Sequence, residues 1–216
     1  EIPSLVVEKK LQTRGHHLII IDPLPHDGLN RIRTESALEQ VADLIHVSLN
    51  RFQMGVAIND RAYIYGLVEA GYSPQEIKSI REYDLKAQNI TDEQIDLNKA
   101  AYAQRVQIGD LTVVFINTTR ISYLNDLHTL ESPRQVRNLL IISQEKGITT
   151  EVNFFGKPDY VNPLQAGLGG WAGGNPQRSM FWGVSGNVDF KKLGVVLQIE
   201  QFEEKIETIL SCRKIL

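Results

Sequence analysis

Two continuous apolar runs stand out in the first 90 residues of the chain. The first covers residues 18–21 and ends at Asp22, and the second covers residues 54–58 and ends at Asn59 and Asp60. Short apolar runs bounded by polar residues are typical of buried strands. We therefore expect two strands here, each of which delivers polar side chains to the loop that follows it.

Helix starts are marked by a serine or threonine with Glu or Gln three residues later, the spacing of a capping box. Pro74, at the first helical position after Ser73, strengthens one of these starts, and a helix-like segment at residues 62–70 precedes that helix. Helices are expected to begin after Ser36 with Glu39, Ser73 with Glu76, and Thr91 with Gln94.

After Gly109 the pattern changes to that of a strand-rich region. Residues 111–116, 139–142 and 148–155 read as strands, and a short turn at residues 145–147 separates the last two. This half of the chain is therefore expected to form a sheet.

The last 60 residues combine a glycine-rich segment with helical patterns on either side. Asp159 is expected to cap a short helix that reaches Leu168, and apolar residues from Ile199 to Leu210 recur at the spacing of an amphipathic helix. The elements together predict an α/β protein with a parallel-sheet amino-terminal lobe at 1–90, a helical connector at 91–108, and a smaller mixed α+β lobe at 109–216.

The composition is that of a folded globular chain and narrows the classes of partner. A formal net charge of -3 argues against a broad basic surface for duplex DNA. The single cysteine, Cys212, excludes an intrachain disulfide and fits a reducing, cytoplasmic compartment. The apolar run at 18–21 is too short to cross a bilayer, so no membrane partner is expected.

The segment after the first predicted strand concentrates groups that bind metals. Asp22, His26 and Asp27 lie within six positions, and Asp60 would come from the neighbouring strand. Carboxylates and imidazoles suit Mn²⁺ or Mg²⁺, so all four residues are candidate ligands, and Asp22, His26 and Asp60 are candidate catalytic residues. The alternative is a surface turn at 22–27 and a helix cap at Asp60.

The segment from Gly167 to Gly183 has the strongest signature of ligand binding. Its glycines allow the main chain to approach an anion, its arginine suits a phosphate, and its aromatic residues suit a base. The alternative is a flexible surface loop whose tryptophans pack in the core. The candidate substrate-binding residues are Gly169, Gly170, Gly173, Gly174, Asn175 and Arg178, with Asn153 from the preceding strand, and Trp171, Phe181 and Trp182 are the candidate stacking residues.

The order of these parts resembles the DHH phosphoesterase superfamily. In that family a strand ends in an Asp-His-His metal motif, a later strand supplies another aspartate, and a terminal domain carries a Gly-Gly-Gly-His-like substrate loop. Residues 18–22 resemble the first strand and Asn59-Asp60 the later one, while 169–175 resemble the loop. The sequence departs from the motif, because Pro23 and Leu24 stand where the paired histidines belong.

The resemblance implies a metal-dependent phosphoesterase that acts on a nucleotide or short oligonucleotide. No aspartate-rich motif precedes residue 18, so a two-metal centre would lack ligands unless the amino-terminal lobe is incomplete in this sequence and further residues precede it. The alternative is a catalytically inactive relative that binds a nucleotide, nucleic acid or protein partner. The expected partners are a phosphate-containing small molecule or short nucleic acid, with a homodimer as a further candidate.

Overall fold

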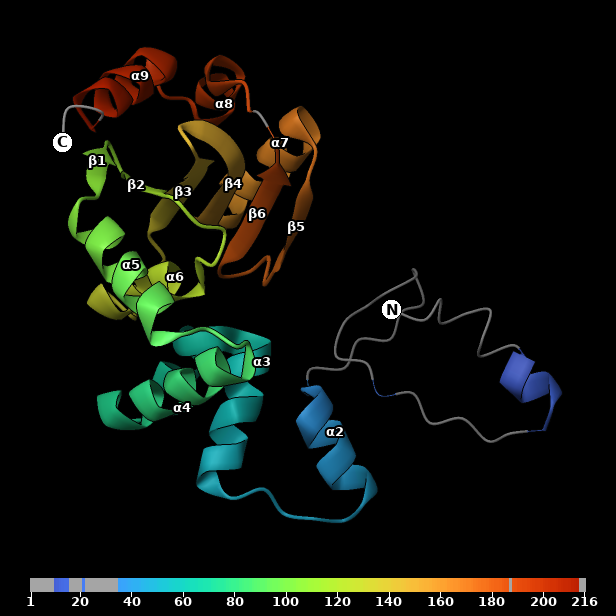
Figure 1. Ribbon diagram of the computed structural model, residues 1–216. Helices are drawn as coiled ribbons and strands as arrows, with labels where there is room; N and C mark the ends of the chain where they lie inside the picture. Colours follow the sequence, from blue (N-terminus) through green and yellow to red (C-terminus); the bar gives the residue numbers. More distant parts are fainter. Residues whose placement is uncertain (1–9, 16–20, 22–34, 187, 214–216) are drawn as a thin grey trace. The chain divides into compact units, whose positions relative to one another are not determined.

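The computed structural model describes residues 10–15, 21, 35–186 and 188–213 (Figure 1). The chain divides into two compact units, residues 1–67 and residues 68–216, and α3 runs across the boundary between them. The helices of the first half are α2 (Ala37–Leu44), α3 (Arg51–Glu69), α4 (Pro74–Ala87) and α5 (Asp92–Ala103).

A six-stranded mixed sheet forms the centre of the second unit. Its strands are β1 (Val106–Ile108), β2 (Leu111–Ile116), β3 (Asn138–Glu145), β4 (Ile148–Gly156), β5 (Trp171–Gly174) and β6 (Met180–Ser185). Their order in the sheet is β1-β2-β3-β4-β6-β5, in which β2 and β3 are parallel and the other neighbours are antiparallel. The remaining helices are α6 (Ser122–Glu131), α7 (Pro158–Leu168), α8 (Phe190–Leu197) and α9 (Phe202–Arg213).

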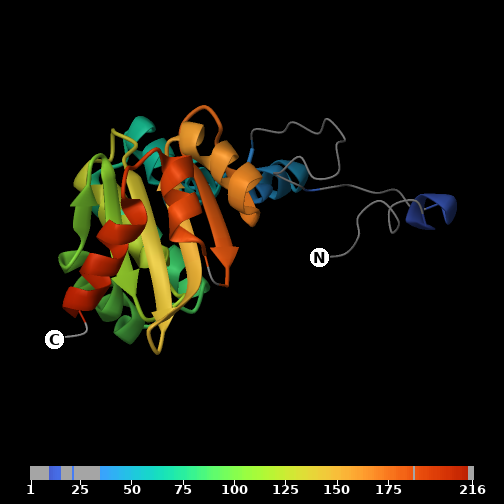
Figure 2. The same cartoon turned by 90° about the horizontal axis from the view of Figure 1, so that it is seen from above.

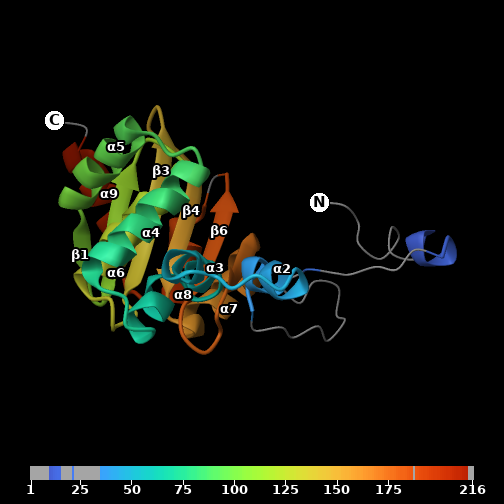
Figure 3. The same ribbon diagram turned by 90° about the horizontal axis from the view of Figure 1, so that it is seen from below.

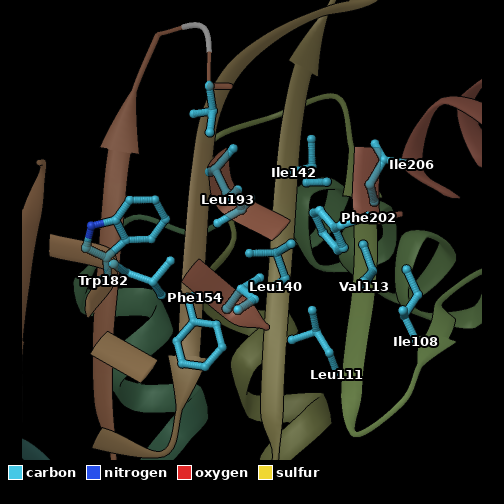
Figure 4. Packing of buried hydrophobic residues seen from close by; sticks show 14 of the residues in the cluster. Ile108, Leu111, Val113, Leu140, Ile142, Phe154, Trp182, Leu193, Phe202 and Ile206 are labelled. Atoms are coloured by element: carbon cyan, nitrogen blue, oxygen red, sulfur yellow. The ribbon is translucent and has the colours of Figure 1, made fainter. Parts of the chain in front are cut away.

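Helices cover both faces of this sheet. Figure 2 shows α8 and α9 over one face, and Figure 3 shows α4, α5 and α6 on the opposite side. The larger core lies under α7, α8 and α9, where Leu140, Phe154 and Trp182 from three adjacent strands meet Leu193 and Phe202 (Figure 4). The second unit is therefore a three-layer α/β/α structure whose central strands β2 and β3 are buried on both faces, which explains the continuous apolar runs in these two strands.

The three predicted capping boxes are confirmed. Ser36, Ser73 and Thr91 each accept a hydrogen bond from the backbone of the residue three positions later, whose side chain accepts one in return. The predicted strands at 111–116, 139–142 and 148–155 are confirmed within β2, β3 and β4. The turn between the last two is confirmed as well, with Lys146 and Gly147 both at positive φ, as a two-residue hairpin loop requires.

The predicted strand at 54–58 is wrong, because these residues lie inside helix α3. The side chain of Asn50 accepts a hydrogen bond from the backbone of Gln53 at 2.9 Å, and the Gln53 side chain accepts one from the backbone of Asn50 at 2.9 Å. This reciprocal pair starts a helix just before the apolar run. A five-residue apolar run fits a buried helix face as well as a strand, so the cap decides between them.

Two further expectations change in the carboxy-terminal region. Asp159 is the second residue of α7, not its cap, since the helix begins at Pro158 after Lys157. The closing helix α9 is confirmed from Phe202 onward, but α8 precedes it and was missed, although Asp189 caps α8 through the backbone N–H of Lys192. The predicted strand at 18–21 lies outside the described residues, apart from Ile21. The parallel amino-terminal sheet that it was expected to form with residues 54–58 loses its second strand, because those residues are helical.

Within the described residues, every helix is too short or too polar to serve as a membrane span. The division of the chain at residues 90 and 108 stays a prediction. Helix α5, placed in the predicted connector, packs its Tyr102 into the smaller apolar cluster with Val114 and Leu124. Asn98 of the same helix is fully buried and accepts the backbone N–H of Leu124, which supplies the first turn of α6 with the cap that its own sequence lacks.

Candidate functional site

The glycine-rich segment forms the β5–β6 hairpin at one edge of the sheet. Gly169 caps the end of α7 and Gly170 immediately precedes β5, both at positive φ. A Cβ on Gly170 would lie 2.1 Å from the carbonyl oxygen of Gly183, so only glycine allows the two strands to approach this closely. The hairpin thus brings the candidate residues Gly169, Gly170, Gly173, Gly174, Asn175 and Arg178 together in one element.

The Trp171 indole occupies the space beside Gly183 on β6, which is free because glycine has no side chain. A Cβ on Gly183 would lie 2.5 Å from two atoms of the Trp171 indole and 2.7 Å from Oδ1 of Asn153. Asn153, Gly183 and Trp171 form one row across β4, β6 and β5. Asn153 is therefore held next to the hairpin, as expected from the sequence, and is only 6% exposed.

A second aromatic row lies next to the first on the same face. Phe155, Phe181 and Gly173 are cross-strand partners, and a Cβ on Gly173 would lie 2.7 Å from the Phe181 ring. The ring centroids of Phe155 and Phe181 are 6.4 Å apart. Trp171 is 43% exposed and Phe181 37% exposed, so this face presents aromatic rings to solvent. We call Phe155, Trp171 and Phe181 the aromatic platform.

A carboxylate that the sequence analysis did not select lies beside this platform. Glu151 is two residues before Asn153 on β4, so both side chains project from the same face as Phe155. The Asn153 amide donates from Nδ2 to Oε1 of Glu151 at 2.7 Å. The alternation of Glu151, Asn153 and Phe155 along a strand could have identified this set, since alternate residues share one face of a sheet.

The turn at the tip of the hairpin is built by its own polar groups. The backbone of Asn175 bonds to Ser179 and Arg178, and its Oδ1 accepts the N–H of Gln177 at 2.9 Å. The guanidinium of Arg178 forms an ion pair with Glu69, at the end of α3. Arg178 is therefore placed to bind an anion, and in this structure a carboxylate occupies that place.

The two tryptophans of the segment have opposite roles. Trp182 is fully buried in the larger core, and its Nε1 donates to the carbonyl of Gly169 at 2.7 Å, which fixes the start of β5. The core-packing alternative is correct for Trp182, whereas Trp171 on the opposite face is exposed. Trp171 of β5 pairs with Gly183 of β6, and Trp182 is the residue next to Gly183. Adjacent positions on a strand face opposite sides of the sheet, so the two tryptophans lie on opposite faces.

Only one of the four expected metal ligands falls within the described residues. Asp60 lies on the exposed side of α3, so its expected position at the end of a strand is wrong, and the argument that paired it with Asp22 through adjacent strands no longer holds. Asp22, His26 and Asp27 lie outside the described residues. Within the described ranges, no three histidine, cysteine or acidic side chains are grouped closely enough to bind one metal ion.

Comparison with known families and curated proteins adds no relative. No family model matches the chain, and no curated protein matches it. The resemblance to the DHH superfamily therefore rests on the motifs quoted above. The assignment of a function to this chain has to come from the chemistry of its own residues.

Another polar cluster joins α5, α6 and the start of β3. His128 is 3% exposed, its Nδ1 lies 3.1 Å from the Tyr102 hydroxyl, and its backbone carbonyl accepts from Arg137. Burial, with the positive charge of Arg137 as a second cause, lowers the pKa of His128 to about 4. Burial also raises the pKa of Tyr102 to about 12. Since these groups bond mainly to one another, we interpret the cluster as structural.

Two grooves elsewhere on the described surface are lined by other residues. A groove of about 440 Å³ lies between α8 and α9, with Val195 and Phe202 in its lining. A second, of about 290 Å³, is lined by Phe115, Asn117 and Gln144 near the ends of β2 and β3. Of the surfaces described here, the aromatic platform combines exposed rings, a polar edge and a nearby arginine.

Proposed function

We propose that the aromatic platform and the 175–179 turn bind a short single-stranded oligonucleotide. The observation that carries this proposal is the pair of exposed rings, Trp171 and Phe181, each lying against a glycine on a flat sheet face. Every nucleobase has a flat apolar face, and stacking on an aromatic side chain contributes about 1–3 kcal/mol per base. Exposed aromatic rings on a rigid sheet lose little entropy when a base covers them.

The spacing within the hairpin favours more than one nucleotide. Trp171 pairs with Gly183, whereas the turn that contains Arg178 begins beyond Met180, three residues further along β6. At about 3.3 Å per residue, the strand alone separates these positions by about 10 Å. Because the 175–179 turn and the Trp171 ring lie at different points along the strand, a dinucleotide or longer strand can place a phosphate at one and a base on the other.

Arg178 would contact a ligand phosphate after that phosphate displaces the Glu69 carboxylate from the guanidinium. Glu69 is largely exposed and is held by a surface ion pair, which contributes little to stability in water. A phosphate offers the guanidinium the same paired acceptors with more negative charge. The ligand phosphate would therefore replace the Glu69 carboxylate.

Fluorescence anisotropy with a labelled oligothymidylate tests the stacking contacts. We expect Trp171→Ala and Phe181→Ala each to weaken binding by roughly 5- to 150-fold, the equivalent of about 1–3 kcal/mol. Tyr83→Ala is the matched control, since it removes an exposed aromatic ring from α4. Unchanged affinity in both platform variants, with wild-type melting temperatures, would contradict the proposal.

The same titration tests the anion exchange at Arg178. Arg178→Ala should weaken binding, whereas Glu69→Gln should strengthen it, because the competing carboxylate is removed while the side chain keeps its size. Lys78→Ala, which removes an exposed cation that pairs with Glu82 on α4, controls for general charge. If Glu69→Gln and Arg178→Ala change affinity in the same direction, the exchange mechanism is wrong.

A second candidate function is metal-dependent hydrolysis of the bound oligonucleotide, and the Asp22, His26 and Asp27 pattern favours it. This second function requires residues 18–21 to form the strand that presents Asp22. It also requires the predicted division into a lobe at 1–90, a connector at 91–108 and a lobe at 109–216. A bound Mn²⁺ or Mg²⁺ would lower the pKa of a water molecule and polarise the phosphoryl group. Mononucleotide release that needs Mn²⁺ and is lost in Asp22→Asn, His26→Ala and Asp27→Asn would support it.

Asp60→Asn separates the two functions further. If Asp60 is a metal ligand, this variant loses Mn²⁺-dependent release and keeps oligonucleotide binding. Binding without release by the wild-type chain at any Mn²⁺ or Mg²⁺ concentration would favour the non-catalytic alternative.

A further inference from the structure

The polar edge of the aromatic platform carries hydrogen-bond acceptors. Glu151 offers two carboxylate oxygens, of which Oε1 accepts from the Asn153 amide. Each carboxylate oxygen has two acceptor positions, so both remain able to accept from a ligand. Asn153 is buried, and the hydrogen bond from its amide nitrogen orients the Glu151 carboxylate.

The acceptors lie next to the ring on which a base would stack. Glu151 and Asn153 are alternate residues of β4, and Asn153 Oδ1 and the Trp171 indole border the same space above Gly183. A base stacked on Trp171 would therefore turn one edge toward Asn153 and Glu151. That edge determines which base is accepted, because the stacking contact itself tolerates every base.

We propose that Glu151 makes this site selective for guanine. Guanine presents two neighbouring donors on its Watson–Crick edge, N1–H and the N2 amino group, which match the two oxygens of a carboxylate. Adenine and cytosine present one donor beside an acceptor, and thymine presents one donor between two carbonyls. An acceptor next to a carboxylate is repelled, so these bases lose hydrogen bonds that guanine keeps.

This inference rests on the proposed oligonucleotide binding and adds its base specificity. A paired contact to one base edge discriminates by about 1–3 kcal/mol, which is roughly 5- to 150-fold in affinity. We therefore expect a thymidine tetranucleotide in which one thymine is replaced by guanine to bind at least about 5-fold more tightly than the all-thymine strand. Replacement by adenine or cytosine should give no comparable gain.

Glu151→Gln tests the assignment. Glutamine keeps the side-chain length and an oxygen that can accept from Asn153, but it exchanges the second acceptor for a donor. The variant should lose the guanine preference, and its affinity for the all-thymine strand should stay the same or rise, because an amide donor no longer repels the thymine carbonyls. A strand with hypoxanthine, which lacks the N2 amino group, should show an intermediate affinity with the wild-type chain. Glu145→Gln, at an exposed position on β3, is the matched control and should keep the preference.

The outcomes separate this inference from the proposed function. Equal affinity for all four bases, with binding still lost in Trp171→Ala, would overturn guanine selectivity and leave oligonucleotide binding in place. A guanine preference that persists in Glu151→Gln would overturn the role of Glu151. Absence of binding to every strand would overturn the proposed function and the selectivity together.

Discussion

Gly183 determines whether the Trp171 ring can lie on the sheet. We predict that Gly183→Ala abolishes oligonucleotide binding, because its Cβ would enter the space of the Trp171 indole and the Asn153 amide. Forcing a methyl group into a packed site costs about 1–3 kcal/mol, so the melting temperature should fall while the fold is retained. Ser185→Ala, on the same strand and face, should leave both quantities unchanged.

His128 makes the stability of the protein depend on pH. Its pKa in the folded chain is about 4, below the ordinary value of 6.5, so the unfolded chain binds the proton more readily. The contribution of His128 to stability is therefore complete above pH 6.5 and is lost as the pH falls toward 4. The loss amounts to at most about 3 kcal/mol, at 1.36 kcal/mol per pKa unit.

Urea unfolding at several pH values measures this contribution. The difference in unfolding free energy between the wild type and His128→Gln should shrink as the pH falls from 6.5 to 4, since glutamine does not titrate. A constant difference for His128→Gln would show that the buried imidazole does not resist protonation.

At the scale of elements, a buried ion pair joins α4 to α6. Nε and Nη2 of Arg81 donate to the two carboxylate oxygens of Asp126 at 3.0 and 2.8 Å, and Nη1 donates to Asp84. Asp126 is fully buried, and Arg81 is nearly so. We predict that Asp126→Asn lowers the free energy of unfolding by about 3–5 kcal/mol, because it removes the buried counter-charge of Arg81 and leaves the guanidinium with only the partly exposed Asp84 carboxylate.

A double variant distinguishes the stability contributed by the Arg81–Asp126 ion pair from the cost of leaving one of its charges alone. Arg81→Met with Asp126→Leu should be less destabilised than Asp126→Asn in urea unfolding, since no charge is left uncompensated in the interior. Lys78→Ala, which breaks the exposed pair with Glu82 on the same helix, should change stability by less than about 1 kcal/mol. If the double variant is the less stable one, the pair contributes directly through its hydrogen bonds.

Local signals predicted most elements because each has a local physical cause. Ser36, Ser73 and Thr91 bond to backbone groups three residues away, so their helices can be located without tertiary information. Residues 54–58 were misassigned because their apolar character fits both periodicities, and the deciding pair, Asn50 and Gln53, uses an amide cap instead of a hydroxyl and a carboxylate.

The candidate site was predictable in its location but not in its register. Glycine density and Arg178 drew attention to residues 167–183 as a glycine-rich loop, whereas the structure forms them into the β5–β6 hairpin with Asn153 beside it. Which tryptophan is exposed depends on how β5 pairs with β6, a long-range property that composition does not reveal. Glu151 was missed for the same reason, because a single glutamate on a strand gains significance only from its neighbours across the sheet.

At the scale of the whole molecule, net charge limits how the protein attracts a polyanion. With a formal charge of -3, the chain has no general attraction for nucleic acid, and Arg178 supplies the phosphate contact that we propose. One such contact on a single strand gives a slope of about -0.7 for log affinity against log salt concentration. Anisotropy titrations over a range of KCl concentrations should show this shallow slope, whereas a slope of about -3 or steeper would require several additional phosphate contacts.

The position of β5 also affects how the ligand surface moves. This strand has four residues, pairs with β6 on one side, and forms the outermost member of the sheet beyond β4 and β6. Detaching the edge strand β5 breaks the hydrogen bonds to one neighbouring strand. Detaching β3 would break the hydrogen bonds to two neighbours and expose both apolar clusters. We therefore expect backbone amide exchange to be faster along β5, which carries Trp171, than along β4, which carries Phe155.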